Sequence, residues 1–341
     1  MWSYAGLTRC WALMWPYAGL TRCWAADVAP GGWPTLAADA SGCATIGDVM
    51  EDGRAAAILR WYESHARDLP WRRPDAGPWA VLVSEIMLQQ TPVSRVLPAY
   101  EAWLARWPAP SALAAASPAD AVRQWDRLGY PRRAIRLHAT AQVITEQHGG
   151  EVPDSMSALL ALPGVGSYTA AAVASFAFGQ RQAVLDTNVR RVLARLVRGS
   201  LRPPTSPTAM EVRLAESLLP AEPGLAPRWS VAVMELGALI CIADRPRCPE
   251  CPVVSACAWH RAGQPGDDPD LGRRRSQGYE GTDRQCRGRL LAVLRDSDGP
   301  VPAARLDAAW PDENQRTRSL ASLVADGLAE SLPGSRYALP R

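Results

Sequence analysis

The sequence contains no lysine, so all 37 of its basic residues are arginine. No lysine amine is therefore available to form a Schiff base, whereas the arginine guanidinium is well suited to bidentate contacts with phosphate. Long apolar runs are also missing, because none reaches the ~18 residues that a membrane-spanning helix needs. We expect a soluble, cytoplasmic protein that does not associate with membranes.

The sequence divides into four segments by composition. Residues 1–50 contain the octapeptide YAGLTRCW twice, which is too few copies for a repeat protein; we interpret them as a disordered N-terminal extension. Residues 51–262 show apolar residues at helical spacing with little strand-like alternation, which predicts an all-α domain. Residues 263–283 are rich in glycine, proline and charge and are predicted to be a linker. Residues 284–341 are predicted to form a small winged-helix-like module ending in a β-hairpin.

Helices are predicted in both folded segments. Those of the all-α domain are expected at 79–90, 94–106, 118–127, 132–148, 154–161, 167–178, 185–198, 207–219 and 224–241. Those of the module are expected at 286–295, 302–309 and 313–328, and the hairpin is expected to turn at Gly334.

Four of the eight cysteines crowd into residues 241–257. Their spacing, C-x6-C-x2-C-x5-C, predicts one four-iron four-sulfur cluster bound by Cys241, Cys248, Cys251 and Cys257. The alternative is a zinc site, which usually combines two close cysteine pairs, but only one such pair occurs here. We expect the cluster to shape a loop that presents two arginines, Arg245 and Arg247, to phosphate groups.

A second motif, LPGVGSYTA, lies at residues 162–170. Gly164, Val165 and Gly166 are predicted to form a tight turn between two helices, because glycine permits unusual backbone geometry. The following helix would then offer unpaired N–H groups and its positive dipole end to a phosphate. An ordinary turn between helices is the alternative.

Two carboxylates stand out in their surroundings. Glu85 lies in AVLVSEIMLQQT, a run that is otherwise apolar or neutral. It is either a solvated position on an amphipathic helix or a catalytic acid whose pKa is raised by burial. Asp186, in AVLDTNV, lies 18 residues after Tyr168 and is either a plain helix cap or a second catalytic carboxylate.

These motifs, in this order and spacing, resemble the helix-hairpin-helix DNA glycosylases of the endonuclease III superfamily. SEIMLQQT, LPW, LGY (128–130), LPGVGSYTA and VLDTNV together resemble the MutY-type adenine DNA glycosylases, over about residues 55–258. The resemblance implies a two-lobed helix-hairpin-helix fold and a base-excision-repair enzyme. It also implies a monomer on the bacterial nucleoid that acts on double-stranded DNA with adenine opposite 8-oxoguanine or guanine. A sliding clamp or a mismatch-repair protein as partner is left open.

The resemblance also implies catalytic roles. Glu85 would protonate N7 of an adenine flipped out of the duplex, and Asp186 would stay ionised and stabilise the sugar cation left behind. Asn188 would position the water or the sugar. Tyr168 stands where bifunctional relatives carry lysine, so the enzyme would be monofunctional, with no strand-cleaving lyase step.

Further residues match the substrate site of the family. Trp71, Arg72, Leu88 and Glu235 match the adenine pocket, and Gln90 and Tyr130 match side chains that wedge into the duplex. For Trp71 and Leu88 plain core packing is as good an interpretation. For Glu235 a role in the pocket is favoured, since we see no other reason to bury this carboxylate.

The chain also departs from the family. The 84 residues after Cys257 do not resemble the Nudix-like domain with which many relatives sense 8-oxoguanine, so we expect a form without it. Pro131 replaces a second tyrosine and Thr187 replaces a glycine. Two rival functions are a thymine or uracil mismatch glycosylase, and a catalytically silent iron–sulfur protein that binds DNA. Glu85 argues against the first, because a pyrimidine has no N7 to protonate.

Overall fold

The computed structural model describes residues 53–222, 224–266 and 278–341. The predicted N-terminal extension and most of the predicted linker lie outside these residues. The rest is helical, as the sequence predicts, and a three-stranded sheet occurs near the C-terminus.

Local sequence signals account for many of the helix boundaries. Ser117 and Ser155 accept hydrogen bonds from the first turns of their helices, as N-cap residues do. Proline occupies the first turn of α3, where its missing N–H costs nothing. The helices of the main domain are α2 (Arg54–His65), α3 (Pro78–Leu88), α4 (Val93–Arg106), α5 (Pro110–Ala114), α6 (Pro118–Trp125), α7 (Arg132–Gln147), α8 (Met156–Ala161), α9 (Ser167–Phe178), α10 (Thr187–Leu196), α11 (Ala209–Ser217), α12 (Leu225–Leu239) and α13 (Ala258–Arg261), with short 3-10 turns at Pro70–Arg72, Cys248–Glu250 and Val254–Ala256.

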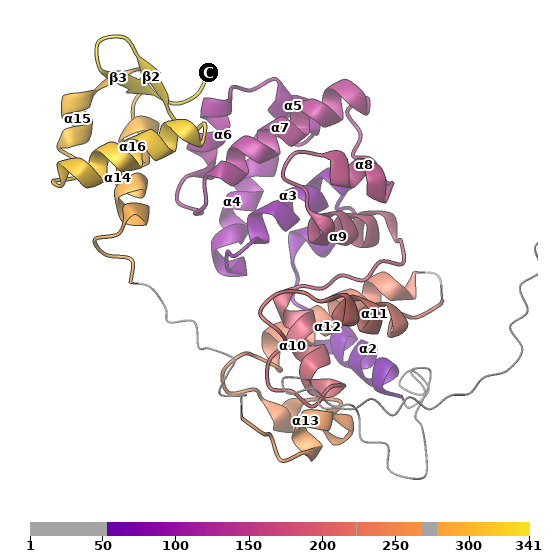
Figure 1. Cartoon of the computed structure of the whole chain (residues 1–341). Coiled ribbons are helices and arrows are strands. Elements are labelled where there is room, and N and C mark those ends of the chain that lie inside the picture. The colour runs from indigo at the N-terminus through magenta and orange to yellow at the C-terminus, as the bar shows by residue number, and fades with distance from the viewer. Residues whose placement is uncertain (1–52, 223, 267–277) are drawn as a thin grey trace, which may run out of the picture. The chain divides into compact units, whose positions relative to one another are not determined.

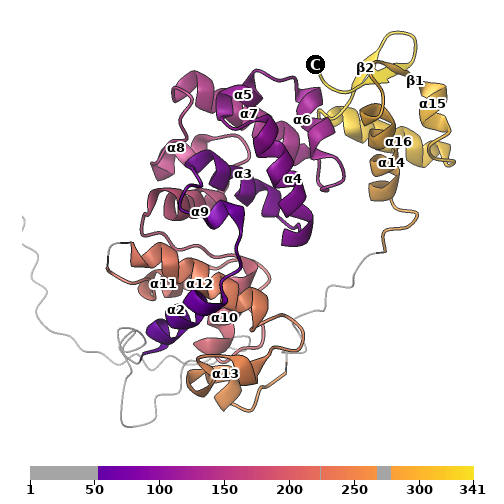
Figure 2. The ribbon, with the colours of Figure 1, turned by 180° about the vertical axis from the view of Figure 1, so that it is seen from behind.

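Two hydrophobic cores give this domain its two lobes. The first core joins Trp71 to the buried faces of α3–α9. The second joins α2 to α10, α11 and α12. In Figures 1 and 2 the indigo helix α2 lies beside α10 and α12 and apart from α3 and α4, which follow it in the chain. Helix α2 thus completes the lobe that is otherwise built from residues 187–239.

The C-terminal segment combines helices with a small antiparallel sheet. It contains α14 (Asp283–Arg295), β1 (Val301–Pro302), α15 (Ala303–Asp307), α16 (Glu313–Ala325), β2 (Glu330–Leu332) and β3 (Arg336–Ala338), and the strand order is β1-β3-β2. The hairpin turns at Gly334, which has a φ of +76°, as predicted. The sequence did not predict β1, whose two residues are too short for an alternating pattern. This order of elements is that of a winged helix.

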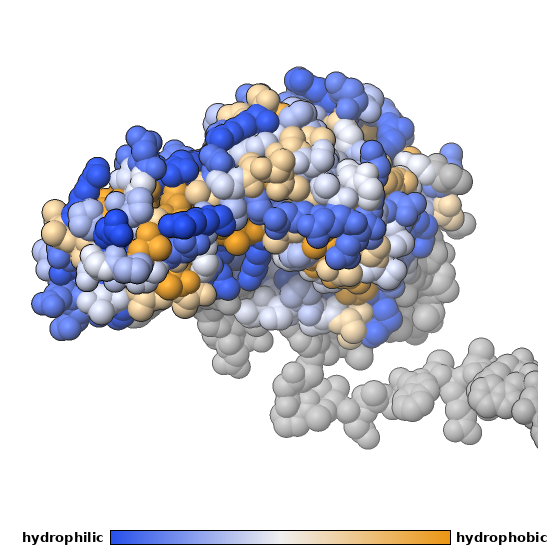
Figure 3. Space-filling view, turned by 90° about the horizontal axis from the view of Figure 1, so that it is seen from above, coloured by the Kyte–Doolittle hydropathy of each residue, from blue (hydrophilic) through white to orange (hydrophobic). Residues whose placement is uncertain are grey.

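The surface is mostly hydrophilic on the face seen in Figure 3, where apolar residues form only small scattered groups. Such scattered groups are normal for a folded protein in water. No helix in the described ranges has the length and apolar character to cross a membrane.

Candidate active site

A cavity of about 1150 Å³ lies between the two lobes and is lined from both. It brings together most of the side chains that the sequence singled out. Those that line it are Trp71, Arg72, Glu85, Leu88, Gln90, Gly164, Gly166, Tyr168, Asp186 and Asn188. Tyr130, Val165, Glu235, Arg245, Arg247 and the four clustered cysteines are not among its lining residues.

Glu85 lies near the end of α3, with only 5% of its surface exposed. The pKa of Glu85 is raised to about 7, chiefly by burial and also by the negative charge of Asp186. A hydrogen bond with Tyr168 and the positive charge of Arg72 act in the opposite direction. The carboxyl group is therefore half-protonated near neutral pH, which suits a general acid. The solvated alternative for Glu85 is wrong.

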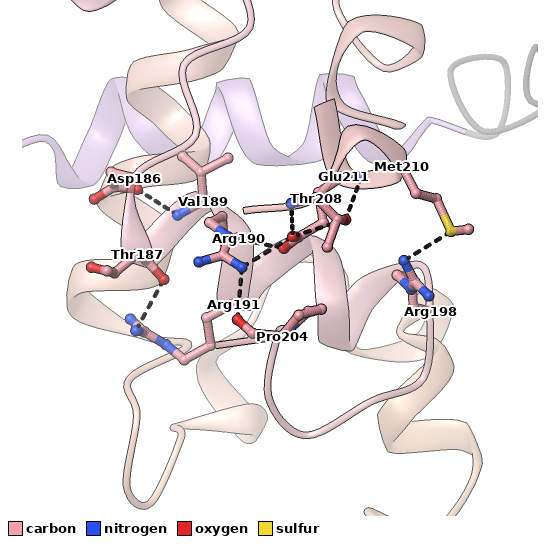
Figure 4. Close-up of polar contacts among 10 residues, drawn as sticks. All are labelled: Asp186, Thr187, Val189, Arg190, Arg191, Arg198, Pro204, Thr208, Met210 and Glu211. Carbon is pink, nitrogen blue, oxygen red and sulfur yellow. Dashed lines mark hydrogen bonds and ion pairs between the residues drawn. The ribbon is translucent and has the colours of Figure 1, made fainter. Parts of the chain in front are cut away.

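Asp186 enters the cavity from the other lobe as the N-cap of α10 (Figure 4). Its carboxylate accepts hydrogen bonds from the Val189 N–H at 2.6 Å and from the Asn188 amide at 2.7 Å. Burial raises the pKa of Asp186, while these two donors lower it. Asp186 can therefore cap α10 and act in catalysis, because the donors at the start of the helix also stabilise its charged carboxylate.

The start of α10 is tied to its surroundings by arginines. Figure 4 shows Arg190 directed at Glu211 of α11, and this buried pair is joined at 2.9 Å. The next residue, Arg191, donates to the Asn188 side chain and to the carbonyls of Gly237 and Cys241, each at 2.7 Å. A network of hydrogen bonds therefore connects Asp186, through Asn188 and Arg191, to the first cysteine of the loop. This role of Arg191 could not be predicted from the sequence, because its partners lie up to 50 residues away.

Glu235 lies in α12 beneath the cavity, with a fully buried side chain. Arg67 donates three hydrogen bonds to it, at 2.7–3.0 Å, and Arg72 donates one at 2.8 Å. Burial alone would raise the pKa of Glu235, but these hydrogen bonds and charges lower it. The carboxylate therefore does have a reason to be buried other than direct contact with a base. It holds the segment that carries Trp71 and Arg72 at the wall of the cavity.

Replacing Glu235 by alanine should cost roughly 2–4 kcal/mol, because it leaves the two arginines without their buried partner. The pKa of Glu235 is lower in the folded state than in the unfolded chain. The stabilisation is therefore present above the unfolded pKa and is lost as the pH falls through the folded value. Urea unfolding at pH 7 and in acid measures both effects. The same change at the exposed Glu151 is the control, and equal stability losses in the two variants would contradict this role.

The remaining predicted pocket residues have mixed environments. Trp71 is 6% exposed and packs edge-on against Tyr100, with ring centroids 5.1 Å apart. Leu88 is partly buried against the same core. Both also line the cavity, so core packing and contact with a bound base do not exclude each other here. Gln90 and Tyr130 are exposed, and both have a positive φ, of 55° and 48°.

The predicted hairpin lies between α8 and α9. Gly164 has a φ of +77°, and a Cβ there would come within 2.9 Å of the Arg136 side chain. Glycine is thus required for two reasons at this position. Gly166 is the N-cap residue of α9, and it carries no side chain that could satisfy the first N–H groups of the helix. The turn therefore has the geometry of an anion-binding helix start.

The four cysteines lie in the loop between α12 and α13. Burial raises the pKa values of the Cys248, Cys251 and Cys257 thiols, and the charges of neighbouring cysteines raise them further, so the four thiols lie within electrostatic range of one another. Arg195, which is almost fully buried, donates to the Cys241 sulfur at 3.4 Å and to the carbonyls of residues 242 and 243. In the described ranges no three ligand side chains converge as they would on a single metal ion. Four neighbouring thiols with an arginine donor fit an iron–sulfur cluster, in which each thiolate binds a different iron.

The predicted phosphate contacts of this loop are exposed. Arg245 has a φ of 66° and, like Arg247, extends from the loop surface. Arg247 lies 4.0 Å from Glu250, and both side chains are more than half exposed. An ion pair this exposed contributes little to stability and does not prevent Arg247 from binding a partner. The exposed Arg245 is accessible as well.

Comparison with known proteins agrees with this geometry. Residues 83–217 match the family model of the HhH-GPD superfamily base excision DNA repair proteins. The chain is 53% identical over 284 residues to an adenine DNA glycosylase of Mycobacterium tuberculosis, covering 83% of this chain and 92% of the relative. It is 36% identical over 221 residues to a thymine-DNA glycosylase of Aeropyrum pernix, covering 62% and 97%. The solved structure of a thermostable thymine-DNA glycosylase aligns with a TM-score of 0.58 and 28% identity, covering 64% of this chain and all of that one.

The two cores, the hairpin and the opposed carboxylates define a DNA glycosylase of the helix-hairpin-helix class, an enzyme of base excision repair. The extent and level of identity then settle the subgroup. The chain belongs to the MutY-type adenine DNA glycosylases.

Proposed function

We propose that this enzyme hydrolyses the N-glycosidic bond of adenine mispaired with 8-oxoguanine or guanine in duplex DNA. The observation that carries the proposal is Glu85, a buried carboxyl group with a pKa of about 7, which shares one cavity with Asp186. In the part of the chain that the structure describes, Glu85 is buried without a bonded cation, whereas Asp186 accepts hydrogen bonds from two donors. Such a pair is expected in glycoside cleavage, where one carboxyl group donates a proton and the other, as a carboxylate, stabilises the sugar cation.

The acid acts first in the proposed mechanism. Adenine is flipped from the duplex into the cavity, and Glu85 donates its proton to N7 of the purine. Protonation withdraws electrons from the glycosidic bond and makes the base a better leaving group. Positioned general acids of this kind contribute ~10²–10⁴-fold to rates. The lining residues Trp71 and Leu88 supply an apolar wall against which a flipped base can stack.

Asp186 acts on the sugar in the second half of the reaction. When the bond between C1′ and N9 breaks and adenine leaves, this carboxylate, held by Val189 and Asn188, stabilises the oxocarbenium ion. Water then attacks C1′ and gives its proton to the Glu85 carboxylate, which restores the acid. Tyr168, which is hydrogen-bonded to Glu85, stabilises the intermediate from the neighbouring helix. Because the sequence contains no lysine, no Schiff base forms on a lysine side chain. We therefore propose a monofunctional glycosylase that leaves an intact abasic site.

The hairpin and the cysteine loop are proposed to hold the DNA backbone. Gly164, Val165 and Gly166 would bind one phosphate through backbone N–H groups, and Arg245 and Arg247 would bind others. Cys241, Cys248, Cys251 and Cys257 would hold one four-iron four-sulfur cluster. The cluster would shape the loop that bears these arginines.

Single-turnover excision on labelled duplexes tests the proposal. One set pairs adenine with 8-oxoguanine, guanine or thymine, and the other pairs thymine or uracil with guanine. Adenine loss, with strand breaks only after alkali, is the expected result. Loss of thymine or uracil instead would assign the enzyme to the mismatch glycosylases, of which the Aeropyrum pernix relative is one by name. No loss of any base would favour a protein that only binds DNA.

A further inference from the structure

Arg133, in the first turn of α7, is a buried cation that the mechanism above does not use. Only 5% of its surface is exposed, and no salt bridge to it occurs in the parts of the chain described here. Burial lowers its pKa to about 10, so it keeps its charge at neutral pH. Its terminal nitrogens lie 2.7–2.9 Å from five acceptors, the carbonyls of Ile86, Met87, Gln89 and Gly129 and the hydroxyl of Thr91. Nη1 faces three of these acceptors with two hydrogens, so one hydrogen is shared between two carbonyls.

Three of these acceptors belong to the C-terminal end of α3. The last carbonyls of a helix have no partner within the helix and carry its negative dipole end. The Arg133 guanidinium therefore serves as a C-cap provided by a distant residue. It closes the helix one turn after Glu85, where the chain must leave the helical path.

Two of the acceptors have a more specific position. The carbonyl of Gln89 immediately precedes Gln90, and the carbonyl of Gly129 immediately precedes Tyr130. Gln90 and Tyr130 both adopt left-handed backbone conformations, which residues other than glycine rarely do. A hydrogen bond that fixes the preceding peptide plane also fixes φ of the next residue. One guanidinium thus holds both strained residues, which are 40 positions apart in the sequence.

The same two residues present exposed side chains at the site. Gln90 lines the cavity and Tyr130 is 51% exposed. The Tyr130 ring packs on the Arg133 guanidinium, whose carbon is 5.5 Å from the ring centroid. Backbone strain of this kind persists where the surrounding structure enforces it, and it concentrates at functional sites. An amide that lines the cavity and an exposed aromatic ring, both held in fixed backbone conformations, are suited to enter a base stack.

We propose that Arg133 is a positioning residue that holds Gln90 and Tyr130 together in the conformation that enters the duplex, so that a base can leave it. This inference deepens the proposed function and rests on it. Arginine is required because only its planar fork supplies several donors in fixed directions. Lysine would keep the charge and lose the simultaneous bonds to Gln89 and Gly129.

The test compares Arg133→Lys with Arg132→Lys, a matched control at the neighbouring arginine. Arg132 has a 54% exposed side chain and makes a 3.3 Å ion pair to Asp326. Both changes are made in a Glu85→Gln background, with 2-aminopurine replacing adenine opposite guanine in the duplex. The fluorescence rise at saturating protein reports unstacking without requiring chemistry. We expect Arg133→Lys to reduce this rise at least threefold, and the control to keep it.

A second readout does not depend on DNA. Hydrogen exchange at the backbone amides of residues 89–91 and 128–130 should become at least tenfold faster in Arg133→Lys, with exchange elsewhere unchanged. Unchanged exchange would overturn the claim that Arg133 holds these two segments in place. Accelerated exchange with an undiminished fluorescence rise would overturn its role in opening the duplex. If the wild-type protein neither excises adenine nor unstacks the probe, the proposed function fails. The exchange experiment still shows whether Arg133 holds residues 89–91 and 128–130 in place.

A milder variant covers the case in which Arg133→Lys does not fold. Thr91→Val removes one acceptor of the guanidinium, at 2.9 Å, and also the hydrogen bond that the Thr91 hydroxyl donates to the Gln89 carbonyl at 3.3 Å. It preserves the shape of the side chain and the four contacts between the guanidinium and carbonyls. We expect the same changes in fluorescence and exchange with smaller amplitude, about twofold or more. A folded Thr91→Val protein in which neither readout moves would overturn the proposal.

Discussion

Glu85→Gln should abolish adenine excision, with a loss of at least ~10²-fold, while duplex binding changes little. Glutamine has nearly the same shape as the acid but cannot donate a proton to N7. Single-turnover rates and a binding titration on the same duplex measure the two effects. Retained turnover would contradict the assigned role of Glu85.

In the wild type, excision should decline as the pH rises above about 7, because the acid is then ionised.

The same variant should reveal the cost of burying the acid. The folded-state pKa of about 7 lies above the ordinary glutamate value of 4.5, which the unfolded chain has. Between these values the native protein keeps a proton that the unfolded chain has released, so wild-type stability falls as the pH rises through this window. At pH 8 the penalty is complete and amounts to about 3 kcal/mol. The stability advantage of Glu85→Gln over the wild type should therefore grow by about that amount between pH 4.5 and pH 8, as measured by urea unfolding.

Asp186→Asn is expected to have the second large effect, a loss of excision of at least ~10²-fold. The neutral amide cannot stabilise the developing positive charge on the sugar. Asparagine is as good a helix N-cap as aspartate, so the free energy of unfolding should change little. Single-turnover rates and thermal unfolding separate the two properties.

Asp312→Asn is the matched control, because Asp312 caps α16 in the same manner, accepting from the N–H of Gln315 at 2.8 Å. It lies outside the cavity lining, so this variant should excise adenine at the wild-type rate. Asp186→Ala provides the converse comparison. It should lose excision and also about 1 kcal/mol of stability, since it removes the cap. Equal activity losses in the two asparagine variants would contradict a specific role for the Asp186 charge, because Asp312 lies outside the cavity lining.

Much of the fold could be predicted from local sequence. Apolar spacing placed helices such as those at 118–127 and 185–198 within a few residues of their observed bounds. The short helix α5 was not predicted, because five residues carry too little periodicity. Helix α6 ends earlier than expected, at Trp125, because Asp126 adopts a φ of 42°. Nothing in an aspartate residue itself signals that conformation.

The site could be predicted only where single residues carry the chemistry. Glu85 and Asp186 stand out because a carboxylate in an apolar run is unusual. The partners of Glu235 could not be predicted, because Arg67 and Arg72 lie more than 160 residues away in the sequence. The contacts of Arg133 are hidden for the same reason. In a chain whose basic residues are all arginine, composition does not distinguish a buried guanidinium from an exposed one.

The two carboxylates are held by helices of different hydrophobic cores, because Glu85 lies in α3, which packs in the first core, and Asp186 caps α10, which packs in the second. A molecule can excise a base only while both lobes are folded, because each lobe holds one of the two carboxylates. The fraction of active enzyme is therefore the fraction of molecules in which both lobes are folded. A substitution far from the cavity that partly opens either lobe lowers turnover in proportion, without altering the chemistry of the remaining molecules. Substitutions in the two cores would then reduce the amount of working repair enzyme in the same way, although they share no contact.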